Sequence, residues 1–327
     1  MHGLYLLWWV QERHVPAPLV AAILAAGELA ITVLEVPTGW LADRYGHRAS
    51  LIVGSLVQVL GMLVCWLGEG AAGALTASLL VALGDAFRSG ADQALLYRSC
   101  TALGRPSEFQ KREAWANSLK LAALVGMTLA GGVIVRVWGF ATGWQVEIAA
   151  SAAGLLVAMA MVEPPAAIDE PLAEHASSPS AAHIPAGVFL LIAPVSVLGA
   201  LSAAASFLFQ TGGGLGAGGV TAIVATITLA EAAGSAIGAR LPARARMLAA
   251  LSTIGVALSI MSAAVPSLLP AMAVLLSLLS GIADPLRAAA IQRLVADSVR
   301  ARAASLASAA DKALTTIGLA VAGLIRR

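Results

Sequence analysis

Residues 39–48 read GWLADRYGHR, a short polar segment between two long apolar runs, Pro18–Gly39 and Ser50–Leu67. Each run is long enough to cross a bilayer as a helix, because about 20 apolar residues span its hydrocarbon core. The segment carries Arg44 and Arg48, and basic residues gather in the cytoplasmic loops of membrane proteins. Residues 39–48 therefore predict a tight cytoplasmic connection between two transmembrane helices.

The composition of the whole chain agrees with this interpretation. Of 327 residues, 59% are hydrophobic and 12% are charged, and the mean hydropathy is +0.86. In a soluble domain, roughly a quarter of all residues are charged. The net charge of +2 is too small for a nucleic-acid-binding surface, and the 32 glycines suit closely packed membrane helices. The composition predicts an all-α polytopic membrane protein and argues against soluble enzymes, disordered chains and nucleic-acid binders.

Long apolar runs become helices in lipid, because the backbone must satisfy its own hydrogen bonds there. Ten spans are predicted: Pro18–Gly39, Ser50–Leu67, Ala71–Leu96, Ala114–Val137, Trp144–Val162, Ile184–Gln210, Gly218–Gly238, Met247–Val265, Leu268–Leu286 and Ala303–Ile325. A stub before them, Leu4–Val10, is too short to cross a bilayer.

The sequence changes character between the fifth and sixth spans. Residues 163–186 contain five prolines and several acidic residues but no lysine or arginine, which is typical of a flexible linker. The predicted organisation is an N-terminal helical bundle at 1–162, a Pro-rich linker at 163–185 and a C-terminal helical bundle at 186–327.

Lysine and arginine are unevenly divided between the two alternating sets of loops. One set holds thirteen: Arg44, Arg48, Arg98, Arg105, Lys111, Arg112, Arg240, Arg244, Arg246, Arg287, Arg293, Arg300 and Arg302. The other set holds Arg13, Arg136, Arg326 and Arg327. This bias predicts a multi-pass protein of the inner (plasma) membrane, with the first set of loops and the linker in the cytoplasm.

The two predicted bundles resemble each other at an offset of 192 residues. Four pairs match at this spacing: Asp92 with Asp284, Lys120 with Lys312, Gly126 with Gly318, and Gly131 with Gly323. Many secondary transporters are built from such repeats, with the substrate bound between them. In this repeat, the span Ile184–Gln210 has only the short stub as its counterpart, and the span Trp144–Val162 has no counterpart. The chain is therefore expected to lack part of a helix at its start and a whole helix at its end.

The segment at 39–48 resembles the signature G-x-L-A-D-R-x-G-R-R/K of the major facilitator superfamily, which lies between its second and third helices. The matching residues are Gly39, Leu41, Asp43, Arg44, Gly46 and Arg48. The resemblance implies two pseudo-symmetric helical bundles, with about 10–11 of the usual 12 transmembrane helices present. It also implies that Asp43 braces an inner gate against Ala303–Ile325. The alternative is that the charges of this motif form a solvated loop.

Three charged residues are predicted to share one face of the span Ala71–Leu96, because Asp85, Arg88 and Asp92 are three and four residues apart. Arg88 resembles an arginine of the family's fourth helix that is linked to proton coupling. The alternatives are a static ion pair and a gate partner for Asp43. Charges within a membrane span usually pair or line a wet cavity.

Glu28 and Glu231 lie in the middle of apolar spans, where a carboxyl group is desolvated and could carry a proton. The alternative is an interhelical hydrogen bond. Four further residues are gating candidates near the predicted inner ends of spans: Lys120, Asp284, Asp311 and Lys312.

Neither a cofactor nor a metal site is predicted. The five histidines fall in or near loops, Cys65 and Cys100 are not expected to pair, and the chain has no nucleotide-binding P-loop. No paired catalytic set lies within a span, so an enzyme is not expected.

The resulting hypothesis is a monomeric secondary transporter of a small organic molecule, a drug-like compound or a metabolite. The resemblance implies export and proton coupling, with a small-molecule substrate, protons and the lipid bilayer as partners. The alternative is a transport-incompetent remnant of such a transporter with a binding or regulatory role.

Overall fold

The computed structural model describes residues 4–89, 91–105, 108–164, 187–212, 216–238, 240–242, 244–294 and 300–325. The predicted linker lies almost wholly outside these ranges. The first half comprises α1 (Tyr5–Leu7), the π-helix η1 (Trp8–Glu12), α2 (Ala17–Tyr45), α3 (His47–Leu67), α4 (Gly70–Arg88), α5 (Ala91–Ala102) and α6 (Phe109–Ala160). The second half comprises α7 (Gly187–Thr211), α8 (Ala217–Gly238), α9 (Ala245–Ala264), the 3-10 helix η4 (Pro266–Leu268), α10 (Leu269–Leu294) and α11 (Arg300–Ile325).

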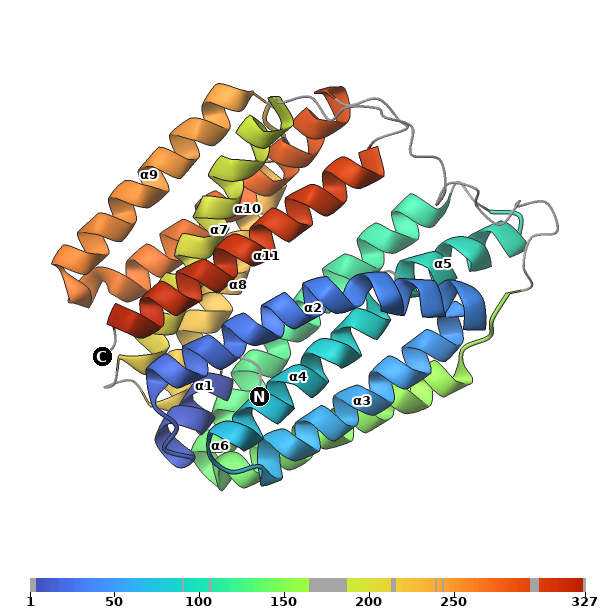
Figure 1. Ribbon diagram of the computed structural model, residues 1–327, viewed down its shortest axis with the longest axis horizontal. Helices are drawn as coiled ribbons and strands as arrows, with labels where there is room; N and C mark the ends of the chain where they lie inside the picture. Colours follow the sequence, from blue (N-terminus) through green and yellow to red (C-terminus); the bar gives the residue numbers. More distant parts are fainter. Residues whose placement is uncertain are drawn as a thin grey trace.

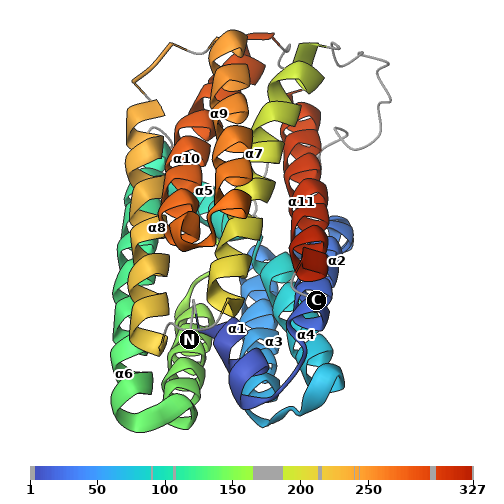
Figure 2. The same cartoon turned by 90° about the vertical axis from the view of Figure 1, so that its left-hand side faces the viewer.

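Eight helical stretches in the described part are long and apolar enough to cross a membrane. One of them is the 39-residue stretch Ala122–Ala160 of α6, which contains parts of two predicted spans. A straight helix of that length would measure about 58 Å, twice the thickness of a bilayer core. Gly139 adopts a φ of +82° within it, and Figure 2 shows α6 turning back on itself. The other seven stretches each match one predicted span, and α11 corresponds to the tenth without being among the eight.

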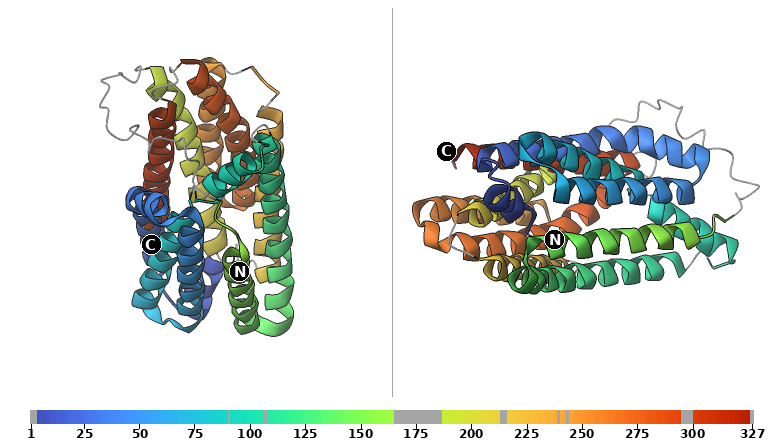
Figure 3. Two further views of the ribbon diagram at one scale, coloured as in Figure 1. Left: turned by 90° about the vertical axis from the view of Figure 1, so that its right-hand side faces the viewer. Right: turned by 90° about the horizontal axis from the view of Figure 1, so that it is seen from below.

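The prediction of one continuous span at Ala71–Leu96 is wrong. Helix α4 ends at Arg88, because Ser89 adopts an extended ψ of 119°, and α5 begins only at Ala91. Helix α5 runs at an angle to the neighbouring helices (Figure 3). Asp92 therefore lies on a different helix from Asp85 and Arg88, and the predicted common face of these three residues does not exist.

The helices form two bundles. In the first, α2 and α3 both pack on α4, and α3 also packs on α6; in the second, α8 and α9 both pack on α10, and α7 packs on α10 and α11. The bundles meet where α2 packs on α11 and where α6 packs on α8, and Figure 1 shows the first of these contacts near the C-terminus. Exchange of the two bundles converts the contact of α2 with α11 into the contact of α8 with α6, as the predicted repeat requires.

Close backbone contacts support the same relationship. A Cβ atom at Gly132 of α6 would collide with Thr221 of α8, and a Cβ atom at Gly323 of α11 would lie 2.7 Å from the Cβ of Ala21 on α2. Small residues let membrane helices approach each other closely. Gly132 directly follows Gly131, which the predicted repeat pairs with Gly323. Equivalent parts of the two bundles therefore make the two inter-bundle contacts.

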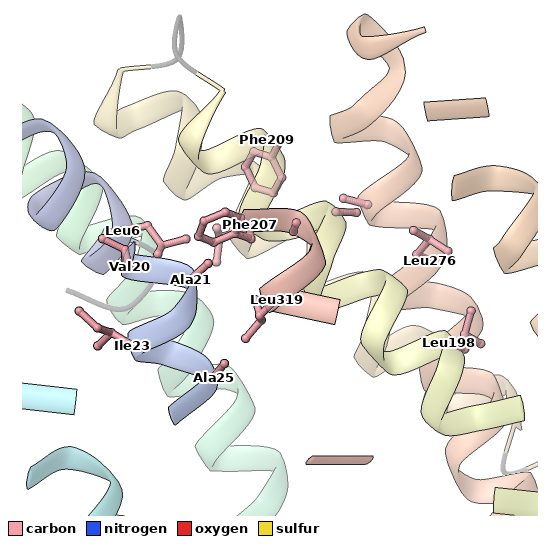
Figure 4. Close-up of a cluster of buried hydrophobic side chains, with 14 of the residues drawn as sticks. Leu6, Val20, Ala21, Ile23, Ala25, Leu198, Phe207, Phe209, Leu276 and Leu319 are labelled. Atoms are coloured by element: carbon pink, nitrogen blue, oxygen red, sulfur yellow. The ribbon is translucent and has the colours of Figure 1, made fainter. Parts of the chain in front are cut away.

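The buried core includes side chains of both bundles. The end of the molecule where α2 begins and α11 ends is called here the terminal end. Figure 4 shows side chains of α2, α7, α10 and α11 in this core, together with Leu6 of the stub. The stub is itself fixed by the indole Nε1 of Trp8, which donates a 2.7 Å hydrogen bond to the carbonyl oxygen of Cys65. The opposite end, where α2 ends and α7 begins, is called the linker end.

Candidate functional site

A cavity of about 900 Å³ lies between the two bundles. Its walls come from the stub, α2, α3, α4 and α6 on one side and from α7, α8 and α10 on the other. Protein interiors are normally packed without voids larger than a water molecule, whereas small-molecule sites measure about 300–1,000 Å³. The cavity therefore has the size of a binding site for a small molecule and is shared by both bundles.

Acidic side chains dominate the charged lining of the cavity. Five lining residues carry a carboxyl group: Glu28, Asp85, Glu147, Glu231 and Asp284. None of the lining residues that the structure describes carries a basic side chain. Carboxyl groups that are held away from bulk water are costly unless they are paired or neutralised.

Four of these carboxyl groups form two equivalent pairs, one in each bundle. Glu28 of α2 and Asp85 of α4 are close enough to interact electrostatically, and so are Glu231 of α8 and Asp284 of α10. The helix pairs that present them, α2 with α4 and α8 with α10, are related by exchange of the bundles. The sequence repeat had paired Asp284 with Asp92 instead, but Asp92 is exposed on α5.

Backbone packing holds each pair in place. A Cβ atom at Gly281 of α10 would collide with the backbone of Glu231, so α8 and α10 touch at this glutamate. On the other side, a Cβ atom at Gly27 would lie 2.5 Å from Ser78 Oγ, which donates a hydrogen bond to the carbonyl of Ile23. Both glutamates thus stand next to a close contact between two helices and have little freedom to move along the helix axis.

Each aspartate of these pairs has an arginine one helical turn later. Arg88 lies 3.9 Å from Asp85, and Arg287 lies 3.1 Å from Asp284. Arg287 also donates a 2.6 Å hydrogen bond to Asp311 of α11, which accepts another from Ser196. Sequence reasoning missed Arg287, although the spacing Asp-x-x-Arg at 85–88 and again at 284–287 is a signal that could have found it. The Glu28 and Glu231 carboxylates have no hydrogen bond or ion pair to any residue in the described part of the chain.

Two further polar groups of the cavity wall lack partners in the described structure. Trp144 is 1% exposed, and its indole Nε1 donor has no hydrogen-bond acceptor; Gln58 Oε1 has no donor. Buried polar groups in native proteins are nearly always paired with protein, water or ligand. Both atoms are buried beside the cavity: Gln58 Oε1 faces Gly84 of α4, and the Trp144 ring packs against Trp8. Neither they nor Glu147 was predicted, because the sequence does not show which face of α3 or α6 meets the other bundle.

The motif at 39–48 lies at the linker end. Gly46 ends α2 with a φ of +100°, as expected of a tight turn, but a Cβ atom at Gly39 would meet nothing within 4 Å. Leu41 is partly buried, and Arg44 stacks over the ring of Trp40 at 5.4 Å. The side chain of Asp43 lies outside the described residues, so its predicted bracing role remains a prediction.

An acidic residue that sequence reasoning missed anchors this motif. The Glu163 carboxylate accepts hydrogen bonds from the backbone N–H groups of His47 (3.2 Å) and Arg48 (2.6 Å), at the start of α3. Arg98 lies 3.6 Å from the same carboxylate, and the Arg48 guanidinium donates to the carbonyl of Met159. A carboxylate at a helix N-terminus satisfies free N–H groups and complements the helix dipole. The motif is thus tied to the end of α6 within its own bundle.

Lys312 connects the two bundles. It forms an ion pair and hydrogen bond with Glu35 of α2, to which Ser89 Oγ also donates at 3.5 Å. Among the gating candidates, Lys312 therefore reaches the other bundle through Glu35. Lys120 is exposed on α6. Among the described residues, no three histidine, cysteine or acidic side chains are arranged to hold a metal ion.

No protein-family model matches the sequence, and no curated protein matches it. Solved structures do match its fold. A bacterial homologue of the human lysosomal transporter Spinster, in an inward-facing and occupied conformation, is 15% identical, with a TM-score of 0.66 over 98% of this chain and 77% of that one. A peptide transporter, POT, is 15% identical, with a TM-score of 0.69 over 100% of this chain and 88% of that one.

A D-xylose–proton symporter is 13% identical, with a TM-score of 0.63 over 95% of this chain and 80% of that one. These neighbours are transporters of the major facilitator type, and at such identities they show the fold. The chain is an all-α multi-pass membrane protein with the two-bundle fold of the major facilitator superfamily, as the motif at residues 39–48 predicted.

Proposed function

We propose that this protein is a secondary active transporter that moves a small organic molecule by alternating access. The observation that carries the proposal is the cavity of about 900 Å³, whose wall is shared by both bundles. Because the walls belong to separate bundles, a tilt of one bundle against the other changes the side from which the cavity can be reached. The solved structures with the same fold include transporters of a sugar and of peptides.

The contacts between the bundles suggest which way the tilt goes. Gly323 packs against Pro18 and Ala21, and Thr316 donates to the carbonyl of Ala25, so α11 and α2 touch along the terminal end. Of the contacts between α2 and α11 described above, the Lys312–Glu35 pair lies farthest toward the linker end. Figure 1 shows the linker-end parts of α2 and α11 running apart. Alternating access requires the contacts at the terminal end to open while the linker ends approach each other, with Asp43 bracing the closed linker end against α11.

Proton coupling and export are parts of the same proposal. Glu28 and Glu231 line the cavity and form no ion pair in the described structure, although Lys312 acts electrostatically on Glu28, so each can take up and release a proton as the cavity changes sides. Export, a drug-like or metabolic substrate and a monomeric state rest on resemblance to the family. We place the protein in the inner membrane, with residues 163–185 as a cytoplasmic linker between bundles at 1–162 and 186–327.

Counterflow in proteoliposomes tests the proposal. Vesicles that contain the purified protein are loaded with a candidate compound, and uptake of the labelled compound from outside is measured without any ion gradient. Accelerated uptake, relative to protein-free vesicles, supports transport. A compound that binds the cavity but never exchanges across the bilayer contradicts it and favours the alternative, a binding or regulatory protein.

A further inference from the structure

The charged lining of the cavity indicates what kind of molecule it holds. The five carboxyl groups face no basic side chain within the described lining. The nearby basic groups are mostly engaged: Arg88 pairs with Asp85, and Arg287 lies between Asp284 and Asp311. Lys312 pairs with Glu35 and also acts electrostatically on Glu28. Lys120 of α6, which acts electrostatically on Asp85, is exposed. An anionic ligand would meet repulsion on both sides of this cavity, whereas a cation would be attracted.

The uncharged part of the lining fits an organic cation rather than a bare ion. Apolar side chains such as Leu24, Ile31 and Met62 share the wall with the carboxyl groups, and such a surface suits the carbon skeleton of an organic molecule. No three acidic groups in the described structure converge closely enough to hold a metal ion.

The wall also carries uncharged polar side chains, among them Ser206 and Gln210 of α7. A hydroxyl or a side-chain amide can donate to or accept from a polar atom of a ligand. A ligand with an ammonium group, an apolar body and a second polar atom matches the carboxyl groups, the apolar side chains and these polar groups.

We infer that the cavity binds a protonated organic amine, recognised by the Glu28–Asp85 pair of one bundle and the Glu231–Asp284 pair of the other. This inference rests on the proposed function, because it takes the cavity to be the substrate site. Since each bundle supplies one pair, the ammonium group can keep a carboxylate partner while the bundles move against each other.

Binding of three probes of similar shape tests the inference: 1-naphthylmethylammonium, 1-naphthylmethanol and 1-naphthoate. Binding to the purified protein in lipid nanodiscs is measured by isothermal titration calorimetry at neutral pH. The ammonium probe is expected to bind at least about tenfold more tightly than the alcohol, and the carboxylate more weakly than both. Equal affinities, tightest binding of the carboxylate, or binding of none of the probes overturns the inference.

Variants locate the binding to the carboxylate pairs. Glu28→Gln and Glu231→Gln are each expected to weaken the ammonium probe by about tenfold and to leave the alcohol unchanged. Glu69→Gln is the matched control, because Glu69 is an exposed glutamate between α3 and α4 that does not line the cavity. Elution volume and melting temperature show that the variants are folded. Unchanged ammonium affinity in both cavity variants contradicts the inference.

The outcomes separate this inference from the proposed function. If counterflow is seen for a neutral or anionic compound and the glutamine variants retain its affinity, the protein is a transporter but the cation site is wrong. If the ammonium probe binds through Glu28 and Glu231 but no compound shows counterflow, the cation site stands and transport fails.

Discussion

At the scale of single residues, Gly46 is the motif position whose backbone conformation a residue with a side chain adopts only with strain. Its φ of +100° lies in the region that side chains with a Cβ atom rarely adopt, and such an atom would stand 3.3 Å from Glu163 Oε2. Gly39 is also part of the motif but lies within α2, with nothing within 4 Å of an added Cβ. The two glycines therefore have different physical reasons to be there.

Gly46→Ala is expected to lower stability by about 1–2 kcal/mol, because it strains the turn and pushes against Glu163. Gly39→Ala is the matched control and is expected to be neutral or to stabilise α2 by up to about 1 kcal/mol, since alanine favours helix. Thermal unfolding of the purified variants in the same detergent checks both. A Gly46→Ala protein as stable as the wild type would contradict this account of the turn.

The Glu163 carboxylate connects the start of α3 with Arg98 of α5 at the linker end of the first bundle. Glu163→Gln removes the charge that complements the start of α3 and the partner of Arg98, so the melting temperature is expected to fall by an amount equivalent to about 1 kcal/mol. Glu69→Gln, at the exposed N-cap position of α4 where the side chain makes no capping hydrogen bond, should lower the melting temperature less. Equal melting temperatures for both variants would show that the cap contributes nothing.

At the scale of elements, a charged pair adds to the packing of α2 on α11. Glu35 and Lys312 have side chains that are 34% and 19% exposed, so their attraction is only partly screened by solvent. Their ion pair lies between the tightly packed terminal end and the separated linker ends of the two helices.

Glu35→Lys and Lys312→Glu are each expected to destabilise the protein, because each places two like charges side by side. The double variant restores an ion pair with its charges exchanged and should recover most of the loss, with a coupling energy of about 1 kcal/mol in a double-mutant cycle. Melting temperatures of the four proteins supply the cycle. Additive losses in the double variant would mean that the two side chains do not interact.

The sequence predicted the helices well where apolar length alone decides. Runs of about 20 apolar residues must be helical in lipid, so most spans were found with small errors at their ends. The break at Ser89 was missed because the predicted span was extended across the polar residues around it to the apolar residues 94–96. Glu147 and Gln58 were missed as cavity residues because their exposure depends on where the second bundle lies, and Glu163 because its partner, the start of α3, is distant in sequence.

At the scale of the whole molecule, the proposed proton coupling assigns proton uptake and release to the two carboxylate pairs of the cavity. If Glu28 or Glu231 carries the transported proton, Glu28→Gln or Glu231→Gln removes the group that is protonated on the acidic side and deprotonated on the other. The rate of transport is then expected to lose most of its pH dependence. Transport by proteoliposomes over a series of external pH values checks this, and a profile that is unaltered in both variants excludes both residues.

The account depends on reciprocal movement of the two bundles. Spin labels placed at exposed Leu103 and Leu241 report the distance between the bundles at the linker end, and labels at exposed Leu67 and Val265 report it at the terminal end. Pulsed electron–electron double resonance measures both distances. The two doubly labelled proteins are compared with and without 1-naphthylmethylammonium and at two pH values. Alternating access predicts that the linker-end distance shortens in the same conditions in which the terminal-end distance lengthens. Two distances that stay fixed in every condition, or that change in the same direction, would contradict it.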